Sequence, residues 1–427
     1  MPTSLTAWLD HIARLHAREM DLGLDRVAAV WSRLSQPDAM PSVVTIAGTN
    51  GKGTCAHFLD LLLRAHGART GLYTSPHLLR FSERIRIDGT CVDDAELCRA
   101  FAQVEKARGE VSLTFFEFTT LAAFVCFQSA ALEVLVLEVG LGGRLDAVNV
   151  LDADVAVVTR IGLDHTDYLG DSLTRIGREK AGVFRSGRPA IVCGRDTPQS
   201  VAEAARDVGA ELLALGDELR VRCSDQRLEL SINRTGDSGP VSLDLPRPDD
   251  GQTDSMTGAI AAAHCLDRLP SDTRIAAMIE GFALSGRQQF VPGSPSFLLD
   301  VAHNPQAAES LAKRLVELPG RKRILLGMLA GKDVGGFVGA LRPHASTWHA
   351  VSTHGSRGLA ARVLGTRLAE LGVDVMHRSS SVAGALSIER ARADMNETIV
   401  VCGSFQIVGP ALAWLGLYSD AFPTNVA

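Results

Sequence analysis

Apolar runs alternate with helical stretches along the first half of this 427-residue chain. Continuous apolar runs of this length are typical of strands in a parallel sheet that helices cover on both faces. In such open sheets, ligands gather where the strands end, so the residues directly after each run are candidates for chemistry. The clearest runs predict strands at residues 43–47, 70–74, 132–139, 155–161 and 190–193.

The pattern changes over residues 211–245, where short alternating runs such as 219–223 and 228–232 predict a small antiparallel addition. A helical stretch at 258–269 follows. Gly, Ser and Pro then mix over 281–296, which we interpret as a linker.

Beyond the linker, the alternation of strands and helices begins again and predicts a second, smaller α/β unit. Its predicted strands lie at residues 297–301, 324–326, 348–352 and 398–401. The chain is also too long for one ordinary core. We therefore expect an N-terminal domain over residues 1–286 and a C-terminal domain over 287–427.

Composition narrows the class of protein. Hydrophobic residues at 46% and charged residues at 22% describe a globular chain without disorder. The 43 basic and 49 acidic residues give a net charge of −6, which argues against a general nucleic-acid surface but permits a locally positive cleft. The eight cysteines lack paired C-x-x-C spacing, and the N-terminal stretch carries charges where a signal peptide is apolar. No apolar run approaches the ~20 residues of a membrane span, so we expect a cytoplasmic protein.

The stretch PSVVTIAGTNGKGT, residues 41–54, reads as a strand that runs into a glycine-rich loop and a helix. It departs from the common phosphate loop G-x-x-x-x-G-K-[ST], because Gly53 separates Lys52 from Thr54. A lysine in such a turn stands at the positive end of a helix, where an anion binds. We interpret the loop as a phosphate site rather than a simple turn. Because the hydroxyl does not directly follow the lysine as in the common loop, we expect the magnesium ligands to come from elsewhere.

Three residues after other strands are candidates for that metal. Ser75 follows the strand at 70–74, and Glu138 stands at the end of an apolar run. A carboxylate there is costly unless a cation or hydrogen bonds compensate it, and a salt bridge with Arg144 is the structural alternative. His165 lies in a polar loop. Taken by itself, it is better explained as a hydrogen-bonded loop histidine than as a metal ligand, since magnesium prefers oxygen ligands.

Six motifs in order resemble the Mur ligase superfamily, and within it the dihydrofolate synthase/folylpolyglutamate synthase family. They are GTNGKGT, YTSPHL, LEVGLGGRLDA, LDHTDYLG, GREKAG and DVAHNP. The resemblance covers nearly the whole chain. It implies an ATP-binding N-terminal domain built on a parallel sheet of the P-loop ATPase type and a smaller, Rossmann-like C-terminal domain that binds glutamate.

The resemblance also assigns residues to the nucleotide, the metal and the reaction. Nucleotide binding is implied for Thr49, Asn50, Gly51, Lys52, Gly53, Thr54, Ser255, Arg287 and Asp300. Metal ligation is implied for Ser75, Glu138, His165 and Lys180, where Lys180 matches a lysine that the family carries as a carbamate. Catalytic roles are implied for Lys52, His165, Lys180 and His303.

The pteroate-binding positions of the family are matched as well. They are Met20, Asp21, Leu22, Thr114, Phe115, Phe116, Glu117, Leu145, Asp146 and Ala147. Phenylalanines can offer an apolar wall to a pterin ring, and a carboxylate can accept its N–H groups. Ordinary core packing is the alternative for the two phenylalanines.

Some positions depart from the family. Ser255 stands where the family commonly has an asparagine near adenine, and Gln288 and Gln406 replace an aromatic residue and a histidine. These departures leave the phosphate and metal residues intact but put adenine recognition and nucleotide preference in question.

The function that the resemblance implies is ATP-dependent ligation of a pteroate or folate carboxylate to L-glutamate through an acyl phosphate. The implied cofactors are ATP and Mg²⁺, with a second Mg²⁺ on a carbamylated Lys180 and a monovalent cation as further options. The substrates would be 7,8-dihydropteroate, reduced folates and L-glutamate, and we expect a monomer without nucleic-acid or membrane partners. The alternatives are a folylpolyglutamate synthase alone, or a paralogue that binds nucleotide without ligase activity.

Overall fold

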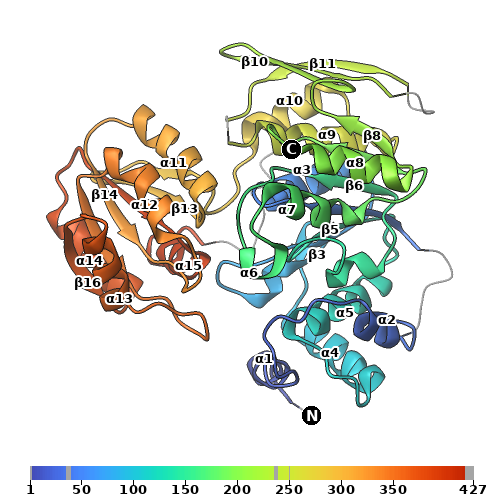
Figure 1. The fold of residues 1–427 in the computed structure, drawn as a ribbon, viewed down its shortest axis with the longest axis horizontal. Coiled ribbons are helices and arrows are strands. Elements are labelled where there is room, and N and C mark those ends of the chain that lie inside the picture. Colours follow the sequence, from blue (N-terminus) through green and yellow to red (C-terminus); the bar gives the residue numbers. More distant parts are fainter. Residues whose placement is uncertain (1, 35–39, 235–238, 250, 419–427) are drawn as a thin grey trace. The chain divides into compact units, whose positions relative to one another are not determined.

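A computed structural model describes residues 2–34, 40–234, 239–249 and 251–418 (Figure 1). These residues fall into two units. Unit 1 holds the described residues of 1–76 and 81–282, and unit 2 holds 77–80 and the described residues of 283–419. The chain passes from unit 1 to unit 2 between residues 282 and 283, a few residues before the expected boundary between 286 and 287. The short segment 77–80, which we expected in the N-terminal domain, belongs to unit 2.

Unit 1 is built on an eight-stranded sheet in which six neighbouring strands run parallel. Two short antiparallel strands extend one edge. In spatial order the strands are β4 (Thr90–Cys91), β3 (Ile85–Ile87), β2 (Thr70–Tyr73), β5 (Val134–Glu138), β1 (Ser42–Ala47), β6 (Val155–Val158), β7 (Pro189–Val192) and β8 (Glu211–Ala214).

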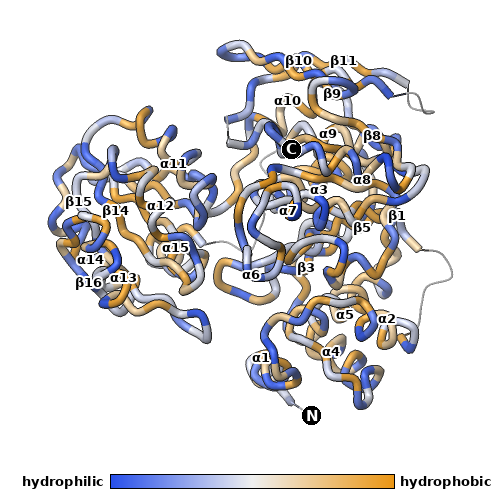
Figure 2. The backbone as a smooth tube through the Cα atoms, viewed as in Figure 1, coloured by the Kyte–Doolittle hydropathy of each residue, from blue (hydrophilic) through white to orange (hydrophobic). Residues whose placement is uncertain are grey.

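Alternating side chains of these strands enter two hydrophobic cores. Val43 and Leu135 face one core, whereas Val44 and Val136 face the other. The first core is covered by α1 (Leu5–Ile12), α2 (Asp25–Trp31), α4 (Asp94–Arg108), α5 (Phe115–Gln128), α7 (Leu173–Lys180) and α8 (Gln199–Val208). The second is covered by α3 (Lys52–His66), α9 (Thr253–Cys265) and α10 (Asp272–Gly281). Figure 2 shows hydrophobic stretches along the strands β1 and β5 between these layers.

The predicted antiparallel addition is a three-stranded sheet. Its strands are β9 (Leu219–Cys223), β10 (Arg227–Ile232) and β11 (Val241–Pro246). Leu230 and Ile232 of β10 are buried in the second core and Leu228 is buried as well, while Arg227 and Glu229 are exposed. The addition predicted over residues 211–245 starts too early. Residues 211–214 form β8, which pairs in parallel with β7 in the main sheet. β8 lies at the sheet edge and is only partly buried, so it lacks the continuous apolar run of its neighbours.

Unit 2 has a six-stranded sheet whose edge strand β12 runs antiparallel and whose other strands run parallel. Its order is β12 (Gln289–Val291), β13 (Ser296–Asp300), β17 (Thr398–Cys402), β14 (Lys322–Leu326), β15 (Thr347–Val351) and β16 (Val375–Ser379). Two cores flank it, one with α11 (Pro305–Glu317), α12 (Val334–Leu341) and α13 (Ala361–Glu370), the other with α14 (Val382–Arg392) and α15 (Phe405–Trp414). This is the predicted second α/β unit. Part of the expected linker is strand β12.

Short elements complete the described chain. They are α6 (Thr166–Leu169) and the 3₁₀ turns η1 (Phe81–Arg84), η2 (Ala147–Val150), η3 (Ala181–Val183) and η4 (Arg342–His344). The strand expected at 155–161 ends at Val158. Thr159 N still donates to Ala47 O of β1, but the Thr159 hydroxyl and Arg160 O hydrogen bond to the glycine-rich loop.

Candidate functional site

The glycine-rich loop connects the end of β1 to the start of α3. Gly51 has a φ of +92°, and Lys52 is the first residue of the helix. A Cβ at Gly48 would lie 1.9 Å from Thr159 Oγ1, and one at Gly51 would lie 2.3 Å from Ser255 Oγ. The loop therefore needs glycine for conformation and for close approach to β6 and α9. The structure places Ser255, a predicted nucleotide residue, directly against the loop.

Hydrogen bonds fix the loop to the residues after β6. Thr49 N donates to Arg160 O at 2.7 Å, and Thr49 Oγ1 donates to Gly162 O at 3.0 Å. Thr159 Oγ1 donates to Asn50 O at 2.9 Å. Lys52 Nζ donates to Thr49 O at 3.2 Å, so the lysine curls over its own loop. A helix start with a lysine in this position is suited to an anion.

Lys180, the last residue of α7, lies beneath the same loop. It is buried, and its Nζ donates to Gly48 O at 2.8 Å. Burial and then the nearby charge of Lys52 lower the pKa of Lys180 from 10.5 to about 7, although Asp164 and Asp146 act in the opposite direction. Lysines are almost never fully buried without a partner, so the burial of Lys180 beneath the loop is unusual.

The register of the sheet brings two predicted metal ligands close to the loop. Ile46 of β1 pairs with Glu138 of β5, and Ser75 follows β2, which pairs with β5 on its other side. Ser75 N donates to Glu138 Oε2 at 3.1 Å, and Glu138 is only 4% exposed. Arg144, the alternative partner of Glu138, pairs with Glu179 Oε2 at 3.1 Å.

His165 stands at the start of α6 with a left-handed backbone, φ +51°. Its backbone N donates to Asp164 Oδ1 at 2.9 Å. Within the described ranges, no three His, Cys, Asp or Glu side chains form a group that could hold a metal ion. The predicted ligand set includes a serine and a lysine as well, and its convergence with His165 stays a prediction.

The predicted pteroate residues around Asp21 form a polar cluster. Arg26 Nη1 donates to Asp21 Oδ2 at 2.9 Å, and His16 Nε2 lies 3.3 Å from the same oxygen. Arg26 also pairs with Glu117 at 2.9 Å. Met20 and Leu22 flank Asp21 and are partly buried.

Helix α5 positions the second group of pteroate residues. Thr114 caps the helix in a capping box with Glu117, each side chain bonding the other's backbone N. Phe115 and Phe116 are only partly buried, and Phe116 packs 6.0 Å from the Tyr73 ring between ring centres. Partial exposure leaves them available to a ligand, which full core burial would not.

Leu145, Asp146 and Ala147 lead into η2. Asp146 is buried and accepts from Leu141 N at 2.8 Å and Val148 N at 3.1 Å. Burial raises the pKa of Asp146 from 3.8 to about 6 against these hydrogen bonds and the charge of Lys52. Because the charge of Lys52 acts on the pKa of Asp146, this carboxyl lies near the loop.

Two of the predicted residues of unit 2, Arg287 and His303, lie beside Phe405. The Arg287 guanidinium lies 5.4 Å above the Phe405 ring, and the His303 ring centre lies 6.2 Å from it. Buried Asp300 accepts from Ala302 N at 2.6 Å and Gln288 N at 3.1 Å. Burial raises the pKa of Asp300 from 3.8 to about 6, partly offset by Arg287.

The departures from the family motifs have structural partners here. Gln288 has a positive φ of +46°, and its Nε2 donates to Ser310 Oγ at 3.1 Å. Gln406 forms two hydrogen bonds with the backbone of His354, at 2.8 and 3.1 Å. Gln406 therefore holds the loop after β15 in place through these two hydrogen bonds.

Sequence reasoning missed a charged cluster beside the loop. Asp254 of α9 pairs with Arg160 after β6 and with Arg195 after β7. The sequence placed Arg160 inside the strand predicted at 155–161, so the strand-end rule did not select it, and nothing in the sequence pairs it with residue 254. None of the three residues was among the candidates.

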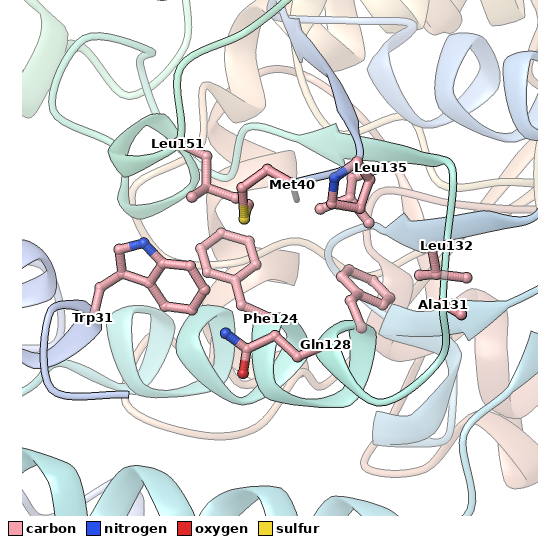
Figure 3. A pocket seen from close by; sticks show the side chains of 10 residues that line it. Trp31, Met40, Phe124, Gln128, Ala131, Leu132, Leu135 and Leu151 are labelled. Carbon is pink, nitrogen blue, oxygen red and sulfur yellow. The ribbon is translucent and has the colours of Figure 1, made fainter. Parts of the chain in front are cut away.

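An apolar pocket at the other end of the sheet is not this site (Figure 3). Met40 and Leu132 lie before β1 and β5, so the pocket opens at the amino ends of the parallel strands. The glycine-rich loop lies at the carboxyl ends. None of the predicted site residues lines the pocket.

Two family models match consecutive parts of this chain. Residues 46–239 match the Mur ligase middle domain, and residues 286–405 match the Mur ligase glutamate ligase domain. The dihydrofolate synthase/folylpolyglutamate synthase of Escherichia coli K12 is 43% identical over 95% of this chain and 94% of its own length. The protein of that name from Mycobacterium tuberculosis H37Rv is 30% identical over 88% and 83%.

Solved structures resemble the whole chain. Escherichia coli FolC in complex with DHPP and ADP has a TM-score of 0.90 at 41% identity and covers 97% of this chain and 99% of that one. A bifunctional folylpolyglutamate synthase/dihydrofolate synthase with Mn, AMPPNP and L-glutamate bound has a TM-score of 0.87 at 41% identity and covers 97% and 98%.

These matches define an ATP-dependent ligase of the Mur type. Within that class, the chain belongs to the dihydrofolate synthase/folylpolyglutamate synthase family. Among the helices of the described residues, none has the length and apolar character needed to cross a bilayer.

Proposed function

We propose that this chain is an ATP-dependent ligase that joins the carboxylate of dihydropteroate or a reduced folate to the amine of L-glutamate. The observation that supports this most is the match to a family member along nearly its entire length, with the loop unit and the C-terminal unit both present. Membership in this family makes the folate and glutamate substrates the natural assignment.

A carboxylate resists attack by an amine, so the γ-phosphoryl group of ATP is first transferred to it. The resulting acyl phosphate has a good leaving group, which the glutamate amine displaces to form the amide and release phosphate. Catalysis of the first step is mainly positioning and charge stabilisation. No side-chain nucleophile is required.

The loop residues have the contacts that this role needs. Thr49, Asn50 and Gly51 form a backbone cradle held by Arg160, Gly162 and Thr159. Lys52 at the helix start would bind terminal phosphate oxygens. Gly53 and Thr54 continue the first turn of α3, where free backbone N–H groups would bind an anion.

The donor set near the loop fits a divalent cation. Ser75 would supply a hydroxyl and Glu138 a carboxylate, and the backbone N of Ser75 donates to that carboxylate. A carboxylate that is 4% exposed gains from a cation. His165 would add an imidazole. When bound, magnesium supplies positive charge that neutralises phosphate oxygens during transfer.

Lys180 would act as a further metal ligand after carbamylation. Its depressed pKa of about 7 leaves much of the amine neutral at neutral pH, and the neutral amine is the form that reacts with carbon dioxide. A carbon-13 carbamate resonance that appears with labelled bicarbonate and is missing in Lys180→Ala would support this. A resonance of equal intensity in the variant would exclude Lys180 as its source.

In unit 2, Arg287 and Asp300 are proposed to bind the nucleotide, and His303 to act in the reaction. The pteroate or folate would bind at Asp21, Phe116 and Asp146 in unit 1. A monovalent cation remains part of the proposal for the metal site.

We further propose a cytoplasmic monomer without nucleic-acid partners. None of the eight cysteines, all within the described residues, is in a disulfide, as in a reducing compartment. Sedimentation equilibrium should give the chain mass of 45.5 kDa, and twice this mass would contradict the monomer.

Phosphate release from ATP tests the function. It should require magnesium, L-glutamate and either dihydropteroate or tetrahydrofolate. Release with tetrahydrofolate but not dihydropteroate would reduce the activity to polyglutamylation. Nucleotide binding without any release would contradict ligation.

A further inference from the structure

Three charged side chains form a cluster beside the glycine-rich loop, which we name the Asp254 cluster: Arg160, Arg195 and Asp254. The Asp254 side chain is 6% exposed and accepts from Arg160 Nε at 2.7 Å and from Arg195 Nε at 3.0 Å. Arg195 N also approaches Asp254 Oδ2 at 3.4 Å. One buried carboxylate thus holds two guanidinium groups, and the cluster carries one net positive charge.

The cluster is joined to the loop at both ends. Arg160 O accepts from Thr49 N at 2.7 Å and from Asn50 N at 3.4 Å. Asp254 directly precedes Ser255, whose hydroxyl lies against Gly51. The pair Arg160–Asp254 therefore spans the side of the loop formed by β6 and α9. If the phosphates of a nucleotide bind in the loop, the rest of the nucleotide lies either on this side of the loop or on the opposite side.

The outer part of Arg160 is available to such a ligand. Its side chain is 30% exposed, and only Nε is used by Asp254. The two terminal nitrogens make no hydrogen bond to any residue that the structure describes. A planar guanidinium held at Nε presents these nitrogens as a fixed pair of donors.

We propose that Arg160, positioned by Asp254, binds the purine base of the nucleotide and determines base selectivity. This rests on the proposed function, which places the nucleotide phosphates in the adjacent loop. Arg160 would be the specificity-determining residue, and Asp254 a positioning residue that acts through it.

The donor pattern decides which base is favoured. Adenine presents an acceptor and an amino donor on its N7 edge, which an amide side chain complements with one donor and one acceptor. Arginine has donors only, and it complements the adjacent O6 and N7 acceptors of a 6-oxopurine. Ser255 has no amide to offer in the neighbouring position. The enzyme should therefore accept GTP and ITP beside ATP, with little selectivity for adenine.

Nucleotide binding to the full-length protein tests this without relying on turnover. Calorimetric titration with AMPPNP and GMPPNP in magnesium should give wild-type Kd values within about tenfold of each other. Arg160→Gln replaces two donors by an amide, so GMPPNP affinity should fall by roughly tenfold or more while AMPPNP changes by less than about threefold. Arg160→Lys keeps the charge without the fork and should also lose GMPPNP affinity selectively.

Asp254→Asn tests the positioning role. It should reduce GMPPNP affinity in the same direction, and the double variant with Arg160→Gln should be no worse than Arg160→Gln alone. Arg188→Gln is the matched control, because Arg188 is an exposed arginine that pairs with Asp154 next to the amino end of β7. The melting temperature of each variant monitors folding.

Equal losses for both nucleotides in Arg160→Gln, with full retention in Arg160→Lys, would assign Arg160 to phosphate and overturn the proposal. Affinities like those of Arg188→Gln would make the cluster purely structural and overturn it as well. Wild-type binding of AMPPNP with GMPPNP more than about a hundredfold weaker would refute the predicted preference alone. Absence of binding to either nucleotide would instead refute the proposed function.

Discussion

Single residues in this chain owe their chemistry to their surroundings. Lys52 and Lys180 are both lysines near one loop, yet Lys180 is buried under it and Lys52 begins a helix. Asp300 and Asp146 are carboxyls whose burial raises their pKa to about 6. Desolvation disfavours a charge, so these groups depend on the backbone N–H donors and cations around them.

Lys52→Ala should reduce ligase turnover by at least ~10²-fold, since it removes a preorganised positive charge from the transferring phosphoryl group. Steady-state phosphate release measures the effect. Lys106→Ala removes an exposed lysine from α4 of the same unit and should leave turnover unchanged. Turnover of Lys52→Ala equal to that of this control would remove Lys52 from the reaction.

Asp300→Asn should alter how stability depends on pH. The folded-state pKa of about 6 exceeds the ordinary value of 3.8, so wild type loses stability as pH rises from about 4 to 6, by roughly 3 kcal/mol in total. The variant does not titrate, so its unfolding free energy relative to wild type should rise over this range and level off above it. Denaturant unfolding without nucleotide measures this.

Asp374→Asn, an exposed substitution in unit 2, controls for simple removal of a charge. A relative stability of Asp300→Asn that stays flat between pH 4 and 6 would mean that the carboxyl is not desolvated in the folded protein.

Elements determine where the loop residues meet. The strands β1, β5 and β6 end at one edge of the sheet, and α3 starts directly after the loop. The loop is squeezed between Thr159 after β6 and Ser255 on α9. Close packing of a loop between two elements restricts it to residues without a side chain.

Gly51→Ala should therefore be more harmful than Gly67→Ala. Both glycines have positive φ, +92° and +104°, and each alanine carries a conformational cost of about 1–2 kcal/mol. A Cβ at Gly67 meets nothing within 4 Å, whereas one at Gly51 lies 2.3 Å from Ser255 Oγ. Only Gly51→Ala should also weaken AMPPNP binding.

Adding Ser255→Ala to Gly51→Ala should recover part of the lost stability, because it removes the clashing hydroxyl. Thermal unfolding of the two single variants and the double variant completes this cycle. Additive losses would show that Ser255 does not cause the strain.

The whole molecule consists of two units with separate cores. Unit 2 also contains a buried ionic network at the side of its sheet. Glu389 accepts from His349 Nδ1 at 2.8 Å and Arg323 Nε at 2.7 Å. Burial opposes ionisation of Glu389, but these hydrogen bonds outweigh it and keep the pKa of its carboxyl below the ordinary value.

Glu389→Ala should destabilise unit 2 by about 3–5 kcal/mol, because it leaves Arg323 and His349 without their shared buried partner. Calorimetry should show two transitions, of which only one moves. Glu370→Ala, which removes an exposed glutamate at the end of α13, should move neither. A single transition that shifts as a whole would mean that the units unfold together.

Much of this fold could be predicted because local patterns carry it. The predicted strand at 219–223 coincides with β9, and the run at 398–401 lies within β17. Where prediction failed, the cause was a tertiary contact. Thr159 and Arg160 read as strand but bind the loop, and residues 211–214 joined the parallel sheet at an edge.

The sequence by itself determined the order of strands and helices, the glycine-rich loop and the family, because these depend on residues close together in the chain or on motifs. Only the tertiary structure brought Arg160, Asp254 and Arg195 together and buried Lys180 beneath Gly48. Such contacts join residues from different elements, and their partners follow from sheet register and helix packing. Desolvation and ion pairing at those contacts then determine the protonation state of each side chain and the direction in which it is held.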